Sequence, residues 1–259
     1  MQSVLYLSHG SPMTAITESP AQAFLQGLGA MLPKPEAILI ASAHWETAAP
    51  RLNAPERLET IHDFYGFPGP LYDLTYPAPP APQLAERAAD LLDAAGLPIA
   101  VDTKRGLDHG AWVPLLLGWP EHDIPVAQIS LQTHAGTAHH VKIGAALAPL
   151  RQENVLIIGS GSFTHDLRRF RPGMDMAAAE TVDVAAFSDW MDERILAGNV
   201  EALVNYRALA PFAAEEHPTE EHLLPLHVAV GAGGLGARVE RLHSSVEFGF
   251  LRMDAYQFN

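Results

Sequence analysis

The sequence contains no cysteine among its 259 residues. Disulfide bonds, thiolate metal sites and cysteine nucleophiles are therefore excluded, and any metal ion must be held by histidine, aspartate or glutamate. Basic residues are also scarce, because 16 Lys and Arg stand against 30 Asp and Glu and give a formal net charge of -14. This balance argues against nucleic acid or an anionic membrane as the main partner.

Long apolar runs are missing too. No uninterrupted apolar segment approaches the roughly 20 residues that a bilayer crossing needs. The first apolar run begins at Val4, so we expect no signal peptide. The sequence therefore predicts a cytoplasmic protein without membrane association. At 48% hydrophobic residues, the chain can still bury a sizeable core.

Histidine, in contrast, is abundant, with 13 residues. Three of them follow short, β-prone apolar runs. These are His9 after Val4 to Leu7, His44 after Ala37 to Ser42, and His165 after Val155 to Ile158. Ligands of open α/β sheets bind outside the carboxyl ends of the strands. We therefore expect these three side chains to approach one another at one edge of a sheet.

Helical patterns alternate with the strands. Helices are predicted over 20–31, 82–95, 111–117, 137–150, 177–197 and 219–230, and further strands over 98–102 and 125–131, with two more within 239–253. The segment 48–82 is rich in proline, glycine and aromatic residues, which favours an ordered lid or pocket wall. The sequence predicts one α/β domain over residues 1–259, with a central mostly parallel or mixed sheet flanked by helices.

Two other histidines have neighbours that suit metal or proton chemistry. His222 is predicted in the first turn of a helix and is close in sequence to Glu216 and Glu221. His109 lies in a loop beside Asp108, a carboxylate that could fix its tautomer. Neutral imidazole suits zinc, iron and copper. The G-x-S-x-G, H-E-x-x-H and Walker patterns are absent, which argues against hydrolases of those classes.

Six blocks of the sequence, taken together and in order, resemble the DODA-type extradiol dioxygenases, which are class III, LigB-like ring-cleaving enzymes. The blocks are Ser8-His9-Gly10-Ser11-Pro12-Met13, Ser42-Ala43-His44-Trp45, Ile61-His62-Asp63-Phe64-Tyr65-Gly66-Phe67-Pro68, Asp108-His109-Gly110, Thr164-His165-Asp166-Leu167 and Thr219-Glu220-Glu221-His222-Leu223-Leu224-Pro225-Leu226. The resemblance spans nearly the whole chain, from the first strand to the last helix.

The resemblance implies a LigB-like fold with one mononuclear divalent metal ion. His9, His44 and His222 match the metal-ligand positions of the family. His165 matches a position that acts either as a fourth ligand or as the catalytic acid/base. His109 matches the substrate-facing histidine, which is also a catalytic position. The implied activity is extradiol cleavage of a catechol, such as DOPA or a related dihydroxyphenyl compound, with O₂ as the second substrate.

The sequence is compatible with several alternatives. Glu221 or Glu216 could replace one histidine as a carboxylate ligand, and the bound metal could be Fe(II) or Zn(II). Phe64 and Tyr65 lie in the aromatic segment and are expected to pack on the substrate ring. A zinc-dependent hydrolase could use the same histidines. A non-catalytic metal-binding relative of the same fold and a histidine-rich structural protein are further possibilities. The oligomeric state is undetermined.

Overall fold

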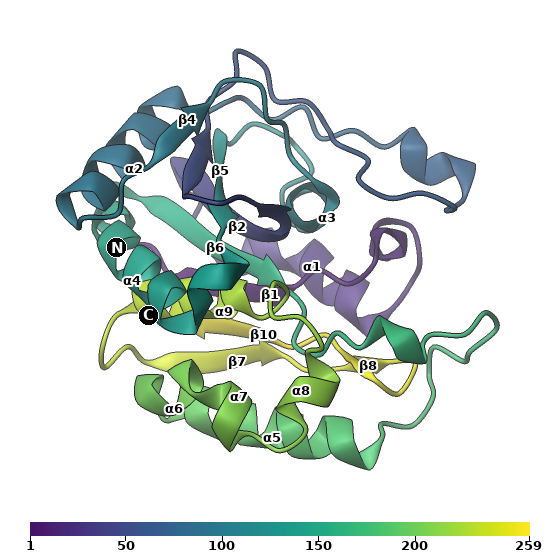
Figure 1. Cartoon of the computed structure of the whole chain (residues 1–259). Helices are drawn as coiled ribbons and strands as arrows, with labels where there is room; N and C mark the ends of the chain where they lie inside the picture. Colours follow the sequence, from purple (N-terminus) through teal and green to yellow (C-terminus); the bar gives the residue numbers. More distant parts are fainter.

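The computed structural model describes all residues from Met1 to Asn259 and contains one sheet of eight strands in the order β4-β3-β5-β2-β6-β1-β10-β7 (Figure 1). Its strands are β1 (Val4–Ser8), β2 (Ala37–Glu46), β3 (Arg51–Asn53), β4 (Ala100–Asp102), β5 (Val126–Leu131), β6 (Val155–Gly161), β7 (Val239–His243) and β10 (Ala255–Phe258). Strands β8 (Val246–Glu247) and β9 (Leu251–Arg252) form a separate hairpin.

The central strands of the sheet are parallel and the edges are mixed. β6 pairs in parallel with β1 and β2, and β2 pairs in parallel with β5. β10 runs antiparallel to both β1 and β7. The predicted mixed α/β sheet is confirmed, and the carboxyl ends of β1, β2 and β6 lie next to one another. That edge is where the three strand-following histidines were expected to meet.

Helices cover both faces of the sheet. The α-helices are α1 (Pro20–Met31), α2 (Pro82–Ala94), α3 (His109–Gly118), α4 (Gly136–Leu147), α5 (Val182–Leu196), α6 (Val200–Val204), α7 (Tyr206–Leu209), α8 (Ala213–Glu216) and α9 (Leu224–Gly233). Short 3-10 turns are η1 (Pro12–Ala15), η2 (Gly69–Tyr72), η3 (Thr133–Ala135), η4 (Ala148–Glu153) and η5 (Leu167–Arg169). None of these helices has the length and apolarity that a bilayer crossing requires.

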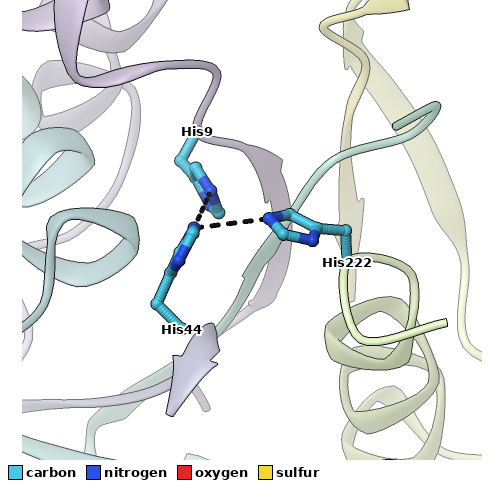
Figure 2. A group of neighbouring side chains, drawn as sticks. All are labelled: His9, His44 and His222. Atoms are coloured by element: carbon cyan, nitrogen blue, oxygen red, sulfur yellow. Dashed lines mark hydrogen bonds between the residues drawn. The ribbon is translucent and has the colours of Figure 1, made fainter. Parts of the chain in front are cut away.

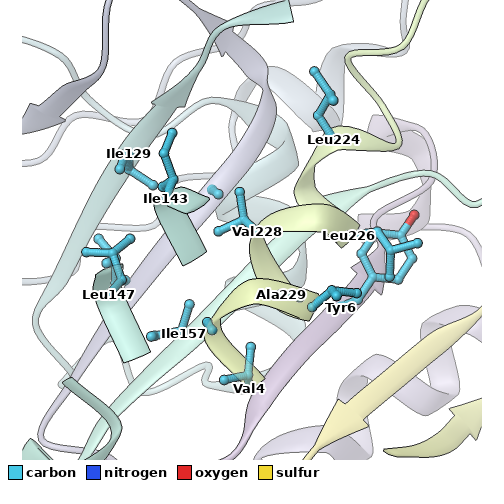
Figure 3. Packing of buried hydrophobic residues seen from close by; sticks show 14 of the residues in the cluster. Val4, Tyr6, Ile129, Ile143, Leu147, Ile157, Leu224, Leu226, Val228 and Ala229 are labelled. Carbon is cyan, nitrogen blue, oxygen red and sulfur yellow. The ribbon is translucent and has the colours of Figure 1, made fainter. Parts of the chain in front are cut away.

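The apolar runs of the central strands supply two separate cores because successive side chains of a strand point to opposite faces. In β1, Val4 and Tyr6 join the larger core of 36 buried residues, whereas Leu5 and Leu7 join the second core of 23. The larger core lies under α9 and α4 (Figure 3). The second lies under α1 and α3. The strand runs are continuous in apolar residues because both of their faces are buried.

Glycines allow α9 to approach its neighbours at backbone distance. A Cβ added at Gly144 of α4 would lie 2.0 Å from the carbonyl oxygen of Val228 in α9. A Cβ at Gly161, the last residue of β6, would lie 2.0 Å from the carbonyl oxygen of His222. The segment that precedes α9 is therefore held directly against the carboxyl end of β6, which brings His222 to the edge of the sheet.

Two predictions about strands were incomplete. β2 continues to Glu46, so His44 lies inside the strand rather than after it. Pairing with β5 shifts register between Ala41 and Glu46, and this bulge lets the strand continue past Ser42. The segment 48–82 also contains β3, which the sequence pattern missed because the strand is only three residues long.

Predicted helix limits were wrong at three places. α3 begins at His109, with Asp108 as its N-cap, so His109 is helical rather than part of a loop. α9 begins only at Leu224, because the hydroxyl of Thr219 donates to Glu221 instead of capping the helix. α5 begins at Val182 and leaves the predicted first turns, from 177, as an irregular segment. The last strand, β10, was not predicted; it is four residues long and lies at the end of the chain.

Candidate active site

Three histidines from distant parts of the chain converge at the carboxyl edge of the sheet (Figure 2). His9 follows β1, His44 lies near the end of β2, and His222 precedes α9. The Nε2 atom of His44 lies 3.1 Å from Nε2 of His9 and 3.3 Å from Nε2 of His222. A tetrahedral ion with metal–nitrogen bonds of about 2.0–2.1 Å holds its ligand nitrogens about 3.3–3.4 Å apart. The spacing of these rings fits one metal ion.

Two of the three rings are held in the tautomer that metal binding requires. The hydroxyl of Ser160 donates to the carbonyl of Gly110, so it accepts from Nδ1–H of His9 at 3.0 Å. Nδ1 of His222 donates to the Glu221 carboxylate at 3.0 Å. A proton on Nδ1 leaves the Nε2 lone pair free, and such partners both orient a ligand and strengthen its basicity.

The third ring, that of His44, faces Asp63. Nδ1 of His44 lies 3.4 Å from one oxygen of the Asp63 carboxylate. The other oxygen accepts hydrogen bonds from the ring Nδ1 and the backbone N–H of His109, at 3.0 and 2.9 Å. Burial acts to raise the pKa of Asp63, but the hydrogen bonds from His109 outweigh it and lower the pKa to about 2. Asp63 therefore stays ionised and holds both rings.

The electrostatics of the cluster favour neutral imidazoles. Burial, reinforced by the neighbouring histidines, lowers the pKa values of His9 and His222 well below their ordinary range. For His44, burial and then His109 lower the pKa to about 4, although nearby carboxylates oppose this. Neutral rings at physiological pH have lone pairs available for a cation, and a divalent ion can neutralise the carboxylates around them. The donor set therefore suits a divalent metal.

Asp108 connects β2, β5 and α3 next to the site through its hydrogen bonds. It is fully buried and accepts hydrogen bonds from the hydroxyl of Ser42 at 2.6 Å, from Gln128 at 2.6 Å and from Arg105 at 2.9 Å. It also caps α3 through the backbone N–H of Ala111. The sequence suggested that Asp108 fixes the tautomer of His109. That suggestion was wrong: as an N-cap, Asp108 faces the helix backbone, and Asp63 holds the ring.

A glycine follows His109 for a steric reason. A Cβ at Gly110 would lie 2.4 Å from the hydroxyl of Ser42, 2.9 Å from Cδ2 of His44 and 3.0 Å from Cε1 of His9. The first turn of α3 therefore forms the floor beneath two of the converging rings. Only a residue without a side chain leaves them in this position.

His165 lies beside the three converging rings but does not share their arrangement. Its ring stacks on that of His222, with centroids 3.4 Å apart and planes inclined by 14°. Burial lowers the pKa of His165 to about 4, against the opposing effect of Glu221. None of the side-chain hydrogen bonds in the structure involves its ring, so its nitrogens have no protein partner.

The other residues expected at the site differ in burial and in their distance from the histidine cluster. Phe64 is buried and its edge faces the ring of His109, at a centroid distance of 5.8 Å. Tyr65 is 92% exposed, and its ring forms no aromatic pair with a histidine of the cluster. Glu221 contacts Nδ1 of His222, on the opposite side of the ring from the converging nitrogens. The Glu216 side chain instead pairs with Arg169 at 3.0 Å.

Sequence reasoning missed the roles of Asp63 and Ser160. Both hold histidine Nδ1 atoms, and neither has a spacing relative to its partner that a sequence pattern would show. The signals available for Asp63 were its place among the aromatic residues of the segment 48–82 and its inclusion in one of the six blocks that resemble the family. Ser160 lies within β6, where a buried hydroxyl needs a partner.

The fold and this site are those of a mononuclear non-haem metalloenzyme. Residues 3–253 match the family model described as the catalytic LigB subunit of aromatic ring-opening dioxygenase. The chain therefore belongs to the LigB family of aromatic ring-opening dioxygenases, enzymes that use a mononuclear metal, and the resemblance drawn from the sequence is confirmed.

Similar proteins align with nearly the whole length of the chain. The chain is 45% identical to the 4,5-DOPA dioxygenase extradiol of Beta vulgaris, with 100% of this chain and 97% of that protein covered. It is 41% identical to the protein of the same name from Mirabilis jalapa, covering 95% and 92%. The crystal structure of an uncharacterised Escherichia coli K12 protein superposes with a TM-score of 0.84 at 30% identity, with both chains fully covered. The chain is an extradiol dioxygenase by these relationships.

Proposed function

We propose that this enzyme opens the ring of DOPA or a related dihydroxyphenyl compound, with Fe(II) held by Nε2 of His9, His44 and His222. The observation that carries the proposal is the convergence of three Nε2 atoms, with the Nδ1 atoms of His9 and His222 donating to acceptors. The relatives named 4,5-DOPA dioxygenase extradiol support a catechol of this kind as substrate. When bound, ferrous iron supplies the electron-transfer route that lets a catechol react with O₂.

His165 is proposed as the base that takes a proton from a catechol hydroxyl. Its ring is neutral because burial lowers its pKa to about 4, and its nitrogens have no other partner. A ring nitrogen binds a metal ion that lies in the plane of its ring. Two parallel stacked rings direct their lone pairs along parallel lines, so the lone pairs do not converge on one ion. The 14° angle between His165 and His222 therefore favours the role of base over that of fourth ligand.

His109 is proposed as the group that faces the substrate and moves the second proton. Asp63 accepts from its Nδ1, which fixes the ring and leaves Nε2 free of a protein partner. Asp63 also stabilises the ring when Nε2 is protonated, so His109 can return a proton to an oxygen of the reacting ring. Phe64, in edge contact with His109, is proposed to pack on the substrate and exclude water. Tyr65 would join it only by turning inward from its exposed position.

Zinc competes with iron for such a site. Three imidazoles bind Zn(II) at least as well as Fe(II) by the general affinity order. A zinc-dependent hydrolase using the same histidines is the alternative chemistry, and a non-catalytic metal-binding relative is the second alternative. Family membership favours the dioxygenase over both.

The proposal covers the chain as one catalytic domain over residues 1–259. The family match to residues 3–253 supports it, because the site takes residues from both ends of that range. A cytoplasmic location is also proposed, and fractionation of cells that express the protein would test it.

Oxygen uptake tests the proposed reaction. The protein is stripped of metal, reconstituted anaerobically with Fe(II) or with Zn(II), and mixed with a panel of catechols that includes DOPA. The ferrous protein should consume one O₂ per catechol and produce a yellow ring-opened semialdehyde, whereas the zinc protein should consume none. The proposal would be overturned if the ferrous protein consumed no O₂ with any of the catechols.

A further inference from the structure

A cavity of about 380 Å³ is lined by residues that are close in sequence to the site, although none of the five site histidines lines it. Its walls begin at segments that follow site residues: Ser11 after His9, Leu167 after His165 and Phe67 after Phe64. The ring of Phe67 packs on that of Phe64 at a centroid distance of 5.4 Å. The volume lies in the range of about 300–1,000 Å³ that small-molecule sites occupy. The cavity is therefore large enough to receive a substituent that extends from a substrate at the metal site.

One wall of the cavity is formed by the turn between β8 and β9. The backbone N–H of Phe248 donates to the carbonyl of Met176 at 2.9 Å, and the N–H of Thr181 donates to the carbonyl of Gly249 at 3.0 Å. The rings of Phe170 and Phe248 meet edge to face at 5.3 Å. The segment between β6 and α5 is thus fixed against this turn.

The cavity is apolar apart from hydroxyl groups and one carboxylate. Eight of its 13 lining residues are hydrophobic, and neither lysine nor arginine is among them. Glu247 lines the cavity and is only 8% exposed. It belongs to no ion pair, and no cationic side chain acts on it; burial raises the pKa of its carboxyl, while Ser19 lowers it. A buried carboxylate without a cation is costly, and a ligand's cation would offset that cost.

We propose that this cavity binds the ring substituent of the catechol and that Glu247 pairs with an ammonium group on that substituent. The apolar walls would cover the carbon chain between the ring and the nitrogen. A substituent that ends in a carboxylate alone would meet Glu247 with no cation in the lining to balance it. The favoured substrates are therefore catechols with a side-chain amine. This inference rests on the proposed ring cleavage only for the orientation of the substrate.

Binding of ligands that have no diol tests the subsite without ring cleavage. Calorimetry would compare 2-phenylethylamine with 2-phenylethanol on the wild-type protein, on Glu247→Gln and on Glu240→Gln. Glu240 is an exposed residue of β7, so its variant carries the same charge change outside the cavity. The wild-type protein and Glu240→Gln should bind the amine at least about tenfold more tightly than the alcohol. Glu247→Gln should bind the two within about twofold. An unchanged preference in Glu247→Gln would overturn the proposal.

Kinetics with the ferrous enzyme separate the subsite from the reaction. The value of kcat/KM should decrease from 2-(3,4-dihydroxyphenyl)ethylamine to 4-ethylcatechol to 3-(3,4-dihydroxyphenyl)propanoate. In Glu247→Gln, kcat/KM for the amine should no longer exceed kcat/KM for 4-ethylcatechol. Met176→Trp fills the cavity, so it should raise KM for the amine more than KM for unsubstituted catechol. Cleavage of all three catechols at equal rates would overturn the subsite alone. Amine binding without cleavage of any catechol would overturn the proposed function and leave the subsite standing.

Discussion

The ring of His165 lies parallel to the ring of His222, with centroids 3.4 Å apart and planes inclined by 14°. Of these two histidines, only His222 directs a nitrogen at Nε2 of His44, at a distance of 3.3 Å. Two histidines in contact thus have different surroundings, one within the converging group and one beside it. This difference is the basis for assigning them separate roles.

Replacement of His165 by alanine should keep the metal and lose ring cleavage. Removing a positioned general base typically costs about 10²–10⁴-fold in rate, while the three converging nitrogens remain. Metal content by mass spectrometry and kcat by oxygen uptake measure the two effects separately. A variant that loses its metal as well would show His165 to be a ligand.

Asp63→Asn should weaken the site without removing any proposed ligand. Its new NH₂ group would face an Nδ1–H of His44 or of His109, placing donor against donor where the carboxylate accepted. Loss of such a partner typically costs about 10–100-fold in metal affinity or activity. Metal titration and kcat would report it.

Asp73→Asn is the matched control for that experiment, since Asp73 is exposed and makes no ion pair. It should behave as the wild-type protein. Equal effects of the two substitutions would show that general charge, and not the contacts of Asp63, controls the site.

Gly110→Ala should lower metal affinity through steric displacement of two rings. The added methyl group would lie 2.4 Å from the hydroxyl of Ser42 and 2.9 Å from Cδ2 of His44. Gly27→Ala is the control, because nothing lies within 4 Å of a Cβ at Gly27 in α1. That control should gain about 0.5–1 kcal/mol of stability from the helix preference of alanine. Wild-type metal affinity in Gly110→Ala would contradict the close packing.

Glu216 makes stability depend on pH. Burial raises its pKa from an ordinary 4.5 to about 7, although Arg169 opposes the shift. Between these values the folded protein holds a proton that the unfolded chain has lost, so this contribution to stability falls as pH rises through the window. Glu216→Gln cannot ionise and should flatten the decline, with a gain on the order of 2 kcal/mol above pH 7. Urea denaturation at pH 5 and pH 8 measures it, with the exposed Glu215→Gln as control.

Sequence patterns predicted the sheet and its histidines because burial on both faces produces continuous apolar runs. His9 and His165 follow such runs, and the parallel order of β1, β2 and β6 brings their ends together. The placement of His222 could not be derived in the same way. It depends on Gly161 allowing a backbone approach between segments 61 positions apart, which leaves no periodic signal. The roles of Asp63 and Glu247 likewise depend on tertiary contacts alone.

Anomalous diffraction at the iron edge from crystals loaded with Fe(II) under anaerobic conditions tests the central claim most directly. Three groups of side chains in the structure could hold an ion: His9 with His44 and His222, His44 with Asp63 and His109, and His165 with Glu221 and His222. We predict one peak per chain, about 2 Å from Nε2 of His9, His44 and His222. A peak in either of the other groups, or none in the first, would contradict the account.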